Sequence, residues 1–160
     1  MKRLLVMLWA VFICSLCTWS QYYSVAAIGK TVTQCNDFAY AKTMLKKEGL
    51  TYDAKFSTAS HARFRNADVA YADEALIVDI YKKKGTKKVE KCVLSFGERY
   101  VRRLSDDLSR HGYTYTSTAG LSIEPFRELW ECNELAVGMY INDKGWFVAT
   151  FFRWGQGVKF

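Results

Sequence analysis

Two segments of the chain carry the spacing of apolar residues that predicts an amphipathic helix. Apolar side chains recur every three or four residues over 37–48 and again over 98–111, which would place them on one face of each helix. Gly49 and Gly112 follow these segments, and glycine readily adopts the left-handed turn that ends a helix. The repeating apolar positions are Phe38, Ala41 and Leu45 in the first segment and Val101, Leu104 and Leu108 in the second.

Strand-like segments follow each predicted helix. Residues 50–56 and 113–117 are short candidates, and two longer hairpins are expected after them. Asn and Gly in the hairpin turns supply the positive backbone angles that tight turns need. The hairpins join 75–81 to 89–94 through Lys82–Thr86, and 135–141 to 146–154 through Asn142–Gly145. The stretches 57–72 and 118–133 stay open, because 63–71 fits a strand and 124–131 fits a strand or a short helix.

An internal repeat organises these elements. Residues 45–52 and 108–115 share the frame L-x-x-x-G-x-T-Y at an offset of 63, and weaker matches follow at offsets of 60 and 58. Chance similarity is the alternative explanation. A duplication predicts an α+β fold: a tandem α-β-β-β pseudo-repeat whose antiparallel sheet carries two helices on one face. Residues 21–97 and 98–160 would be the repeats of one compact domain, and the open sheet face would suit a saddle-shaped binding module.

The first twenty residues have the pattern of a secretory signal peptide. A basic start, Lys2-Arg3, precedes an apolar run over 4–14, and small polar residues follow as far as Ser20. Cleavage is expected after Ser20, and a second acceptable site follows Ala27. The alternative is an uncleaved membrane anchor lengthened through residue 27. Either way the chain is expected to be exported, to the periplasm or beyond the cell, and residues 1–27 could contact the membrane.

The composition favours a folded domain with a modest basic excess. Half of the 160 residues are hydrophobic, 16% are aromatic and there is a single proline, which disfavours disorder. The net charge is +7, and losing Lys2 and Arg3 with the leader reduces it by two to +5. This excess suits an unknown envelope protein, anionic lipid or polysaccharide as partner. Nucleic acid is not expected, because the chain is exported and its basic residues are not interleaved with aromatic ones.

The basic residues gather in one hairpin turn, and aromatic residues gather near the end of the chain. The lysines would meet an anionic surface, or simply form a solvated turn that guards the sheet edge. The aromatic strand over 146–154 would be buried core or an exposed platform for a ligand. The candidate binding residues are therefore Lys82, Lys83, Lys84, Lys87, Lys88, Trp146 and Trp154.

No arrangement of residues in the sequence identifies an active site. His61 is expected in a polar surface loop, and His111 in the last turn of the second helix. Metal-binding spacings and phosphate-binding glycine motifs are missing, so neither a metal nor a cofactor is predicted. Two of the three mature cysteines would pair in an oxidising compartment, without the sequence saying which two. They are Cys35, Cys92 and Cys132.

These observations favour a cell-envelope binding module without catalytic activity, which contacts a protein partner or an anionic surface. A small secreted hydrolase or thiol enzyme that uses a Cys/His pair is one alternative. A membrane-anchored structural subunit is the other.

Overall fold

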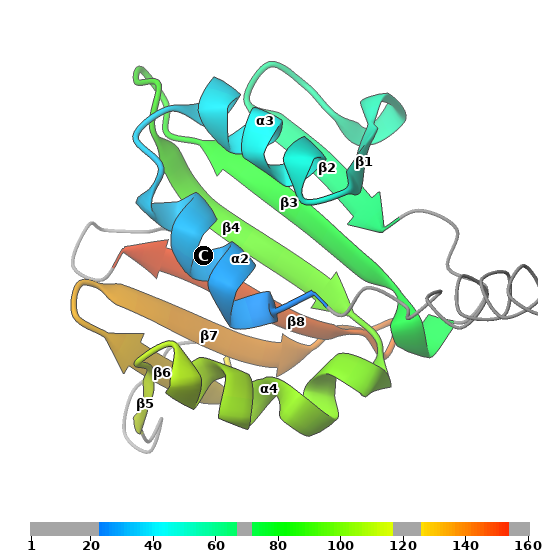
Figure 1. The fold of residues 1–160 in the computed structure, drawn as a ribbon, viewed down its shortest axis with the longest axis vertical. Coiled ribbons are helices and arrows are strands. Elements are labelled where there is room, and N and C mark those ends of the chain that lie inside the picture. The colour runs from blue at the N-terminus through cyan, green and yellow to red at the C-terminus, as the bar shows by residue number, and fades with distance from the viewer. Residues whose placement is uncertain (1–22, 67–71, 117–125, 154–160) are drawn as a thin grey trace, which may run out of the picture.

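An eight-stranded antiparallel sheet carries three α-helices on one of its faces, so the fold is α+β (Figure 1). The computed structural model describes residues 23–66, 72–116 and 126–153. Within these ranges the helices are α2 (Val25–Gln34), α3 (Phe38–Lys47) and α4 (Glu98–Arg110). The strands are β1 (Leu50–Asp53), β2 (His61–Asn66), β3 (Leu76–Lys82), β4 (Val89–Phe96), β5 (Thr114–Thr116), β6 (Glu128–Cys132), β7 (Leu135–Ile141) and β8 (Phe147–Arg153). Short 3₁₀ turns, η1 (Ala54–Phe56) and η2 (Ala72–Glu74), precede β2 and β3.

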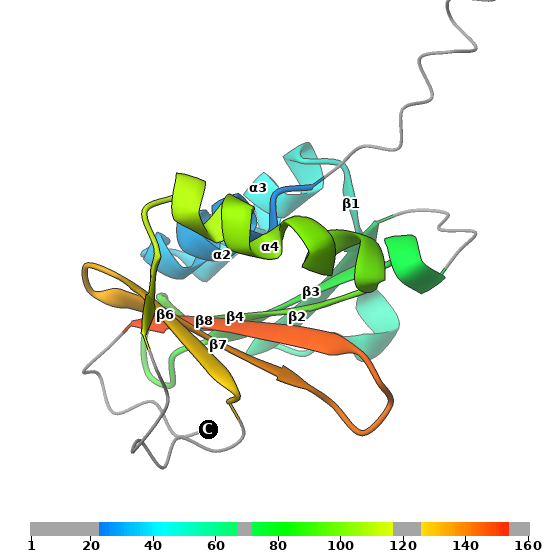
Figure 2. The ribbon, with the colours of Figure 1, turned by 90° about the horizontal axis from the view of Figure 1, so that it is seen from below.

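The strand order places the two longest hairpins side by side at the centre of the sheet. Strands lie in the order β1-β2-β3-β4-β8-β7-β6-β5, so β4 pairs with β8 while β1 and β5 form the edges. Figure 2 shows α2, α3 and α4 together on one side of this sheet. The opposite side has no helix of comparable length among the described residues.

The two predicted helices form where the spacing of apolar residues placed them. Helix α3 buries Phe38, Ala41 and Leu45, and α4 buries Leu104 and Leu108 together with Tyr100. Each ends at a glycine with a positive φ, +87° at Gly49 and +84° at Gly112.

A carboxylate caps the start of α3. Asp37 accepts hydrogen bonds from the backbone amides of Ala39 and Tyr40, at 2.7 and 3.0 Å. These bonds, led by that of Tyr40, hold the pKa of Asp37 below its ordinary value, and the nearby Lys87 and Lys82 add to the effect.

Both predicted hairpins are confirmed, and each of the two open stretches contains a strand. The β3–β4 and β7–β8 hairpins match the expected segments closely. Strand β2 occupies part of the first open stretch, and β6 shows that 128–132 is extended rather than helical. Helices α3 and α4 are therefore each followed by four strands, not three. Residues 67–71 and 117–125 lie outside the described residues.

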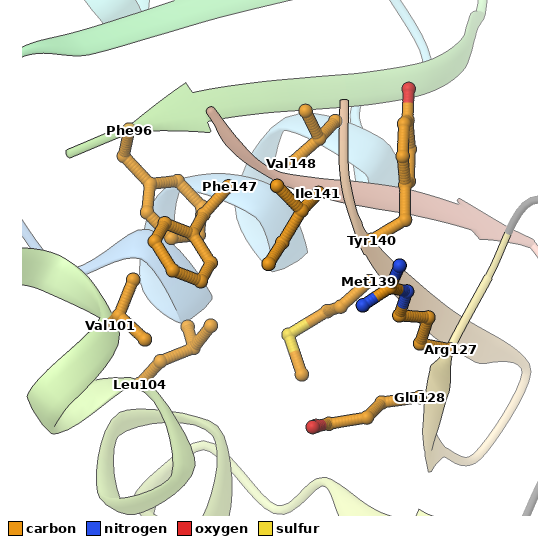
Figure 3. Close-up of a pocket in the computed structure, with 10 residues that line it drawn as sticks. All are labelled: Phe96, Val101, Leu104, Arg127, Glu128, Met139, Tyr140, Ile141, Phe147 and Val148. Carbon is orange, nitrogen blue, oxygen red and sulfur yellow. The ribbon is translucent and has the colours of Figure 1, made fainter. Parts of the chain in front are cut away.

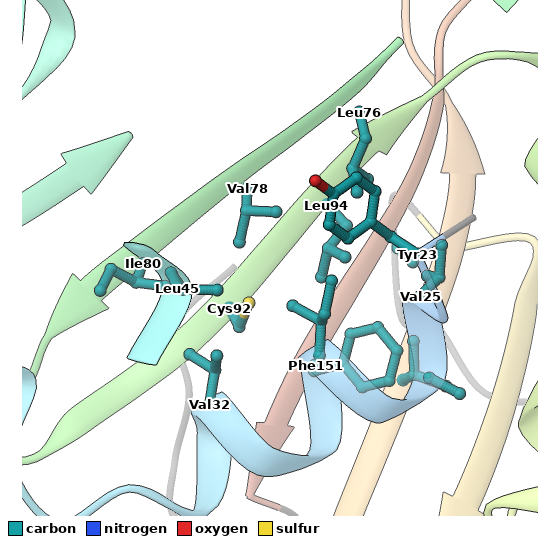
Figure 4. Packing of buried hydrophobic residues seen from close by; sticks show 14 of the residues in the cluster. Tyr23, Val25, Val32, Leu45, Leu76, Val78, Ile80, Cys92, Leu94 and Phe151 are labelled. Atoms are coloured by element: carbon teal, nitrogen blue, oxygen red, sulfur yellow. The ribbon is translucent and has the colours of Figure 1, made fainter. Parts of the chain in front are cut away.

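The prediction of only two helices is wrong, because α2 was not expected. Its apolar residues Val25, Ile28 and Val32 are buried, and Figure 4 shows this helix over the side chains of β4 and β8. Cleavage after Ala27 would remove the first turn of α2 with the buried Val25 and Ala26, whereas cleavage after Ser20 leaves the helix whole. In the described part of the chain, no helix has the length and apolar character to cross a membrane.

Polar contacts fasten α2 to α4 at both ends of their contact. Ser24 caps α2 by accepting from the amide of Ala27, and its hydroxyl donates to Oδ1 of Asp107 on α4 at 2.7 Å. The amide of Ala26 donates to Oδ2 of the same carboxylate at 2.9 Å. Near the end of α4, Nζ of Lys30 donates to the carbonyl oxygen of His111 at 2.8 Å. The negative carboxylate of Asp107 thus lies at the start of α2, and the positive ammonium group of Lys30 lies at the end of α4. The helix dipole favours a negative charge at the start of a helix and a positive charge at its end.

Gly29 allows α2 to approach the sheet closely, and we predict that Gly29→Ala is destabilising. The added methyl group would overlap the Phe151 ring, which is itself buried in β8. Overpacking of this kind typically costs about 1–3 kcal/mol, and here it should outweigh the roughly 1 kcal/mol that alanine gains over glycine in a helix. Urea unfolding should therefore show that the free energy of unfolding falls by up to about 2 kcal/mol.

Thr31→Ala is the matched control, because Thr31 lies on the exposed side of the same helix. It should change the free energy of unfolding by less than about 0.5 kcal/mol. Equal stability of the two variants would contradict the close packing of α2 on β8.

Candidate functional site

The lysine hairpin, defined here as residues 82–88, projects from one end of the sheet. A turn with Gly85 at φ +75° connects β3 to β4. The linker between α2 and α3 holds the base of this hairpin: the amide of Phe38 donates to the Lys87 carbonyl at 2.6 Å, and the amide of Val89 donates to the Cys35 carbonyl at 3.3 Å. Backbone hydrogen bonds therefore hold the base of the hairpin in place.

Positive charge dominates the lysine hairpin. The side chains of Lys83, Lys84, Lys87 and Lys88 are exposed, and Lys82 is half-buried. Among the described acidic side chains, none forms a salt bridge with Lys82, Lys84, Lys87 or Lys88. Asp37, close enough to Lys87 and Lys82 to have its pKa lowered by them, is the acidic group at its base.

The predicted aromatic residues do not join the lysine hairpin. Trp146 is half-buried in the β7–β8 turn, and Phe147 pairs with Phe96 at the end of β4 that lies farthest from the lysine hairpin. Trp154 lies outside the described residues. Within β8 both Phe151 and Phe152 are about 1% exposed, so the strand is buried on both faces, as the core interpretation of this segment expected.

A second polar cluster, which the sequence did not predict, lies on the sheet face away from the helices. Asp79 in β3 is buried, and its Oδ1 lies 2.7 Å from Nε2 of His61 and accepts from Nε of Arg63 at 2.8 Å. Its Oδ2 accepts from Nη2 of Arg63 at 2.9 Å. The expectation of His61 in a surface loop is wrong: it is the first residue of β2, and Arg63 and Asp79 are paired across the sheet.

Aromatic rings surround the cluster of His61, Arg63 and Asp79, called the open-face cluster below. His61 stacks on Tyr81 with ring centroids 4.7 Å apart, and the guanidinium of Arg63 lies 5.2 Å from the ring of Phe56 in η1. Burial raises the pKa of Tyr81, and the Asp79 carboxylate adds to that shift. Because Arg63 and His61 already occupy both oxygens of Asp79, the carboxylate holds β2 against β3 rather than offering itself to a ligand.

Neither histidine ring contacts a thiol in the described part of the chain. His111 directs Nδ1 to the Asp107 carbonyl at 2.8 Å, as expected for a histidine at the end of a helix. Cys132 contacts the backbone oxygen of His111 instead, and Cys92 is fully buried.

All three described cysteines are free thiols, so pairing of any two stays a prediction. Burial raises the pKa of Cys35, and raises that of Cys92 well above its ordinary value. Among the described residues, no three His, Cys, Asp or Glu side chains come together as metal ligands would.

Two apolar cavities open on the helix side of the molecule. The first, of about 220 Å³, lies between the start of α4 and the ends of β4, β7 and β8 (Figure 3). Val101, Leu104, Met139 and Phe147 point into it in that view, and Arg127 and Glu128 are at its rim. The second, of about 210 Å³, lies between α2 and α3 and includes Tyr23, Met44 and Glu48.

Comparison with known proteins adds no further identification. No protein family, no curated protein and no solved structure matches this chain. The functional argument therefore rests on the geometry described above.

We predict that Asp79→Asn destabilises the fold by about 2 kcal/mol. The substitution removes the negative charge that both Arg63 and His61 contact, and breaking a buried ion pair typically costs about 3–5 kcal/mol. The side chain of Arg63 is 30% exposed, so solvent should reduce that loss. Asp106→Asn, at an exposed position of α4, is the control and should change stability by less than about 0.5 kcal/mol. Equal urea midpoints for the two variants would refute a structural role for the cluster.

The burial of the thiols predicts an order of chemical modification. Cys35 is partly exposed, whereas Cys92 is buried under the helices and its pKa is raised. A thiol reagent applied to the reduced native protein should modify Cys35 first, and should reach Cys92 only as the protein unfolds. Peptide mapping by mass spectrometry measures this order, with a urea-unfolded sample as control. Rapid labelling of Cys92 in the native protein would show that the core opens there.

Proposed function

We propose that the mature chain is a non-catalytic binding module of the cell envelope, and that the lysine hairpin contacts an anionic surface there. The supporting observation is that five lysines lie within residues 82–88, on a turn whose backbone is held at its base by the linker between α2 and α3. Exposed cationic side chains on a turn that is held at its base suit a charged surface better than a shaped ligand pocket.

We further infer that the domain is two copies of one helix-and-four-strand unit. The order of helix, glycine and four strands occurs twice, and the units pair through β4 and β8. The buried residues Ala41 and Leu45 of α3 correspond to Leu104 and Leu108 of α4 at the offset of 63. Residues 21–97 and 98–160 would then be the two repeats.

The duplication provides an internal comparison for the lysine hairpin. The β7–β8 turn, residues 142–146, has the same position in its unit and a glycine of positive φ, Gly145, but contains Lys144 as its single lysine. A hairpin of this kind therefore folds without a lysine cluster. This comparison favours a binding role for the lysines over a requirement of the fold.

The enzyme alternative lacks comparable support, because no thiol or hydroxyl nucleophile of the described residues contacts a histidine ring. A membrane-anchored subunit differs from the proposed module only in what happens to the N-terminal segment. N-terminal sequencing of the exported protein distinguishes those two.

We predict that replacing Lys84, Lys87 and Lys88 with serine weakens binding to anionic vesicles about a hundredfold. Each basic residue near an anionic surface contributes about 1 kcal/mol, so three contribute about 3 kcal/mol. The measurement is co-sedimentation of residues 21–160 with phosphatidylglycerol vesicles at low salt, and binding should weaken as salt rises.

The matched control removes three exposed charges elsewhere, by serine at Lys47, Arg110 and Lys144. It has the same net charge as the hairpin variant and should retain most of the binding. If the two variants bind equally, or if the unmodified chain ignores the vesicles, then the hairpin does not contact anionic lipid. If an acidic polysaccharide binds the control variant but not the hairpin variant, then the polysaccharide, rather than lipid, is the anionic surface that the hairpin contacts.

A further inference from the structure

The first apolar cavity lies beside Val101, a residue of α4 whose counterpart in α3 is aromatic. At the offset of 63, Val101 of α4 corresponds to Phe38 of α3. Phe38 is 6% exposed and packs in the main core, and its amide bonds to the lysine hairpin. Val101 is smaller and half-buried, and it lines the cavity of about 220 Å³. This comparison rests on the proposed correspondence of the two units.

The walls of this cavity suit an uncharged ring. Apolar side chains from four elements line it, among them Phe96, Val101, Leu104, Met139, Ile141 and Phe147. An apolar cavity of about 150 Å³ in another protein is known to hold benzene, so about 220 Å³ is sufficient for a phenyl ring. Ile141 is also 42% exposed, which is unusual for a large apolar residue beside a cavity.

The rim of the cavity favours a peptide as the source of the ring. Arg127 and Glu128 are exposed neighbours there, and their opposite charges cancel. Such a rim does not select a charged ligand, but it can hydrogen-bond to the amide groups of a polypeptide. Polar groups around an apolar pocket of this kind fix the orientation of what binds.

We propose that this cavity binds a phenylalanine-like side chain of a polypeptide partner. The ring enters between α4 and β7, contacts Met139 and Phe147, and takes the place that Phe38 occupies in the first unit. The cavity lies at the opposite end of the sheet from the lysine hairpin, because Phe147 pairs with the last residue of β4. Failure of either proposed contact therefore leaves the other intact.

The methionine methyl groups provide a direct test. Without residues 1–20 the chain has two methionines: Met139 lines this cavity and Met44 lines the cavity between α2 and α3. Residues 21–160, labelled with ¹³C at the methionine methyl groups, would be titrated with N-acetyl-phenylalanine amide to millimolar concentration. The Met139 signal should shift and saturate while the Met44 signal stays in place. N-acetyl-alanine amide should move neither signal.

Two substitutions at one position complete the test. Val101→Phe should fill the cavity, raise Tm and weaken binding of the probe at least tenfold. Val101→Ala should enlarge the cavity and retain binding, which controls for disturbance of α4. A Met139 signal that never responds, or that responds equally in both variants, would overturn the proposal. A response to toluene but not to N-acetyl-phenylalanine amide would overturn the peptide source of the ring.

Discussion

The packing of α2 on the β4–β8 pair is the contact on which the rest of the structure depends. The sheet is continuous only because these two strands pair, and α2 covers the apolar side chains that they present on the helix side. Gly29 lets the helix lie directly on Phe151, and Asp107 holds its first turn to α4. A short helix thus covers the junction between the β3–β4 and β7–β8 hairpins. Burial of apolar area of this kind is the main source of stability in a domain of this size.

Local signals in the sequence were sufficient for most of the regular elements. The spacing of Phe38, Ala41 and Leu45 identified α3, and the glycines after α3 and α4 marked the ends of both helices. The β3–β4 and β7–β8 hairpins were predicted equally well from the turn-forming residues between their strands. These features depend on neighbouring residues alone, and they are the ones that periodicity and turn chemistry can report.

The remaining features depend on partners distant in the sequence. Helix α2 comes soon after the apolar run over 4–14, so the spacing of Val25, Ile28 and Val32 was not distinguished from that segment. The open-face cluster needs the register of β2 against β3, which brings Arg63 opposite Asp79. Alternation along a correctly placed β2 would have put Arg63 on the same face as His61, but its start was not recognised. The cavity beside Val101 depends on how completely the neighbouring side chains fill the space between them. The pattern of apolar and polar residues does not report this.

Helix α2 separates the first described residue of the chain from the lysine hairpin. Tyr23, the first described residue, lies at the start of this helix, and the lysine hairpin is held just beyond its end through Cys35 and Phe38. Ten helical residues separate the two by about 15 Å. A tether that enters at Tyr23 would hold the cationic tip on the far side of the domain, pointing away from its own attachment. In that state the domain would bridge two surfaces, whereas a released chain could turn its tip toward either of them.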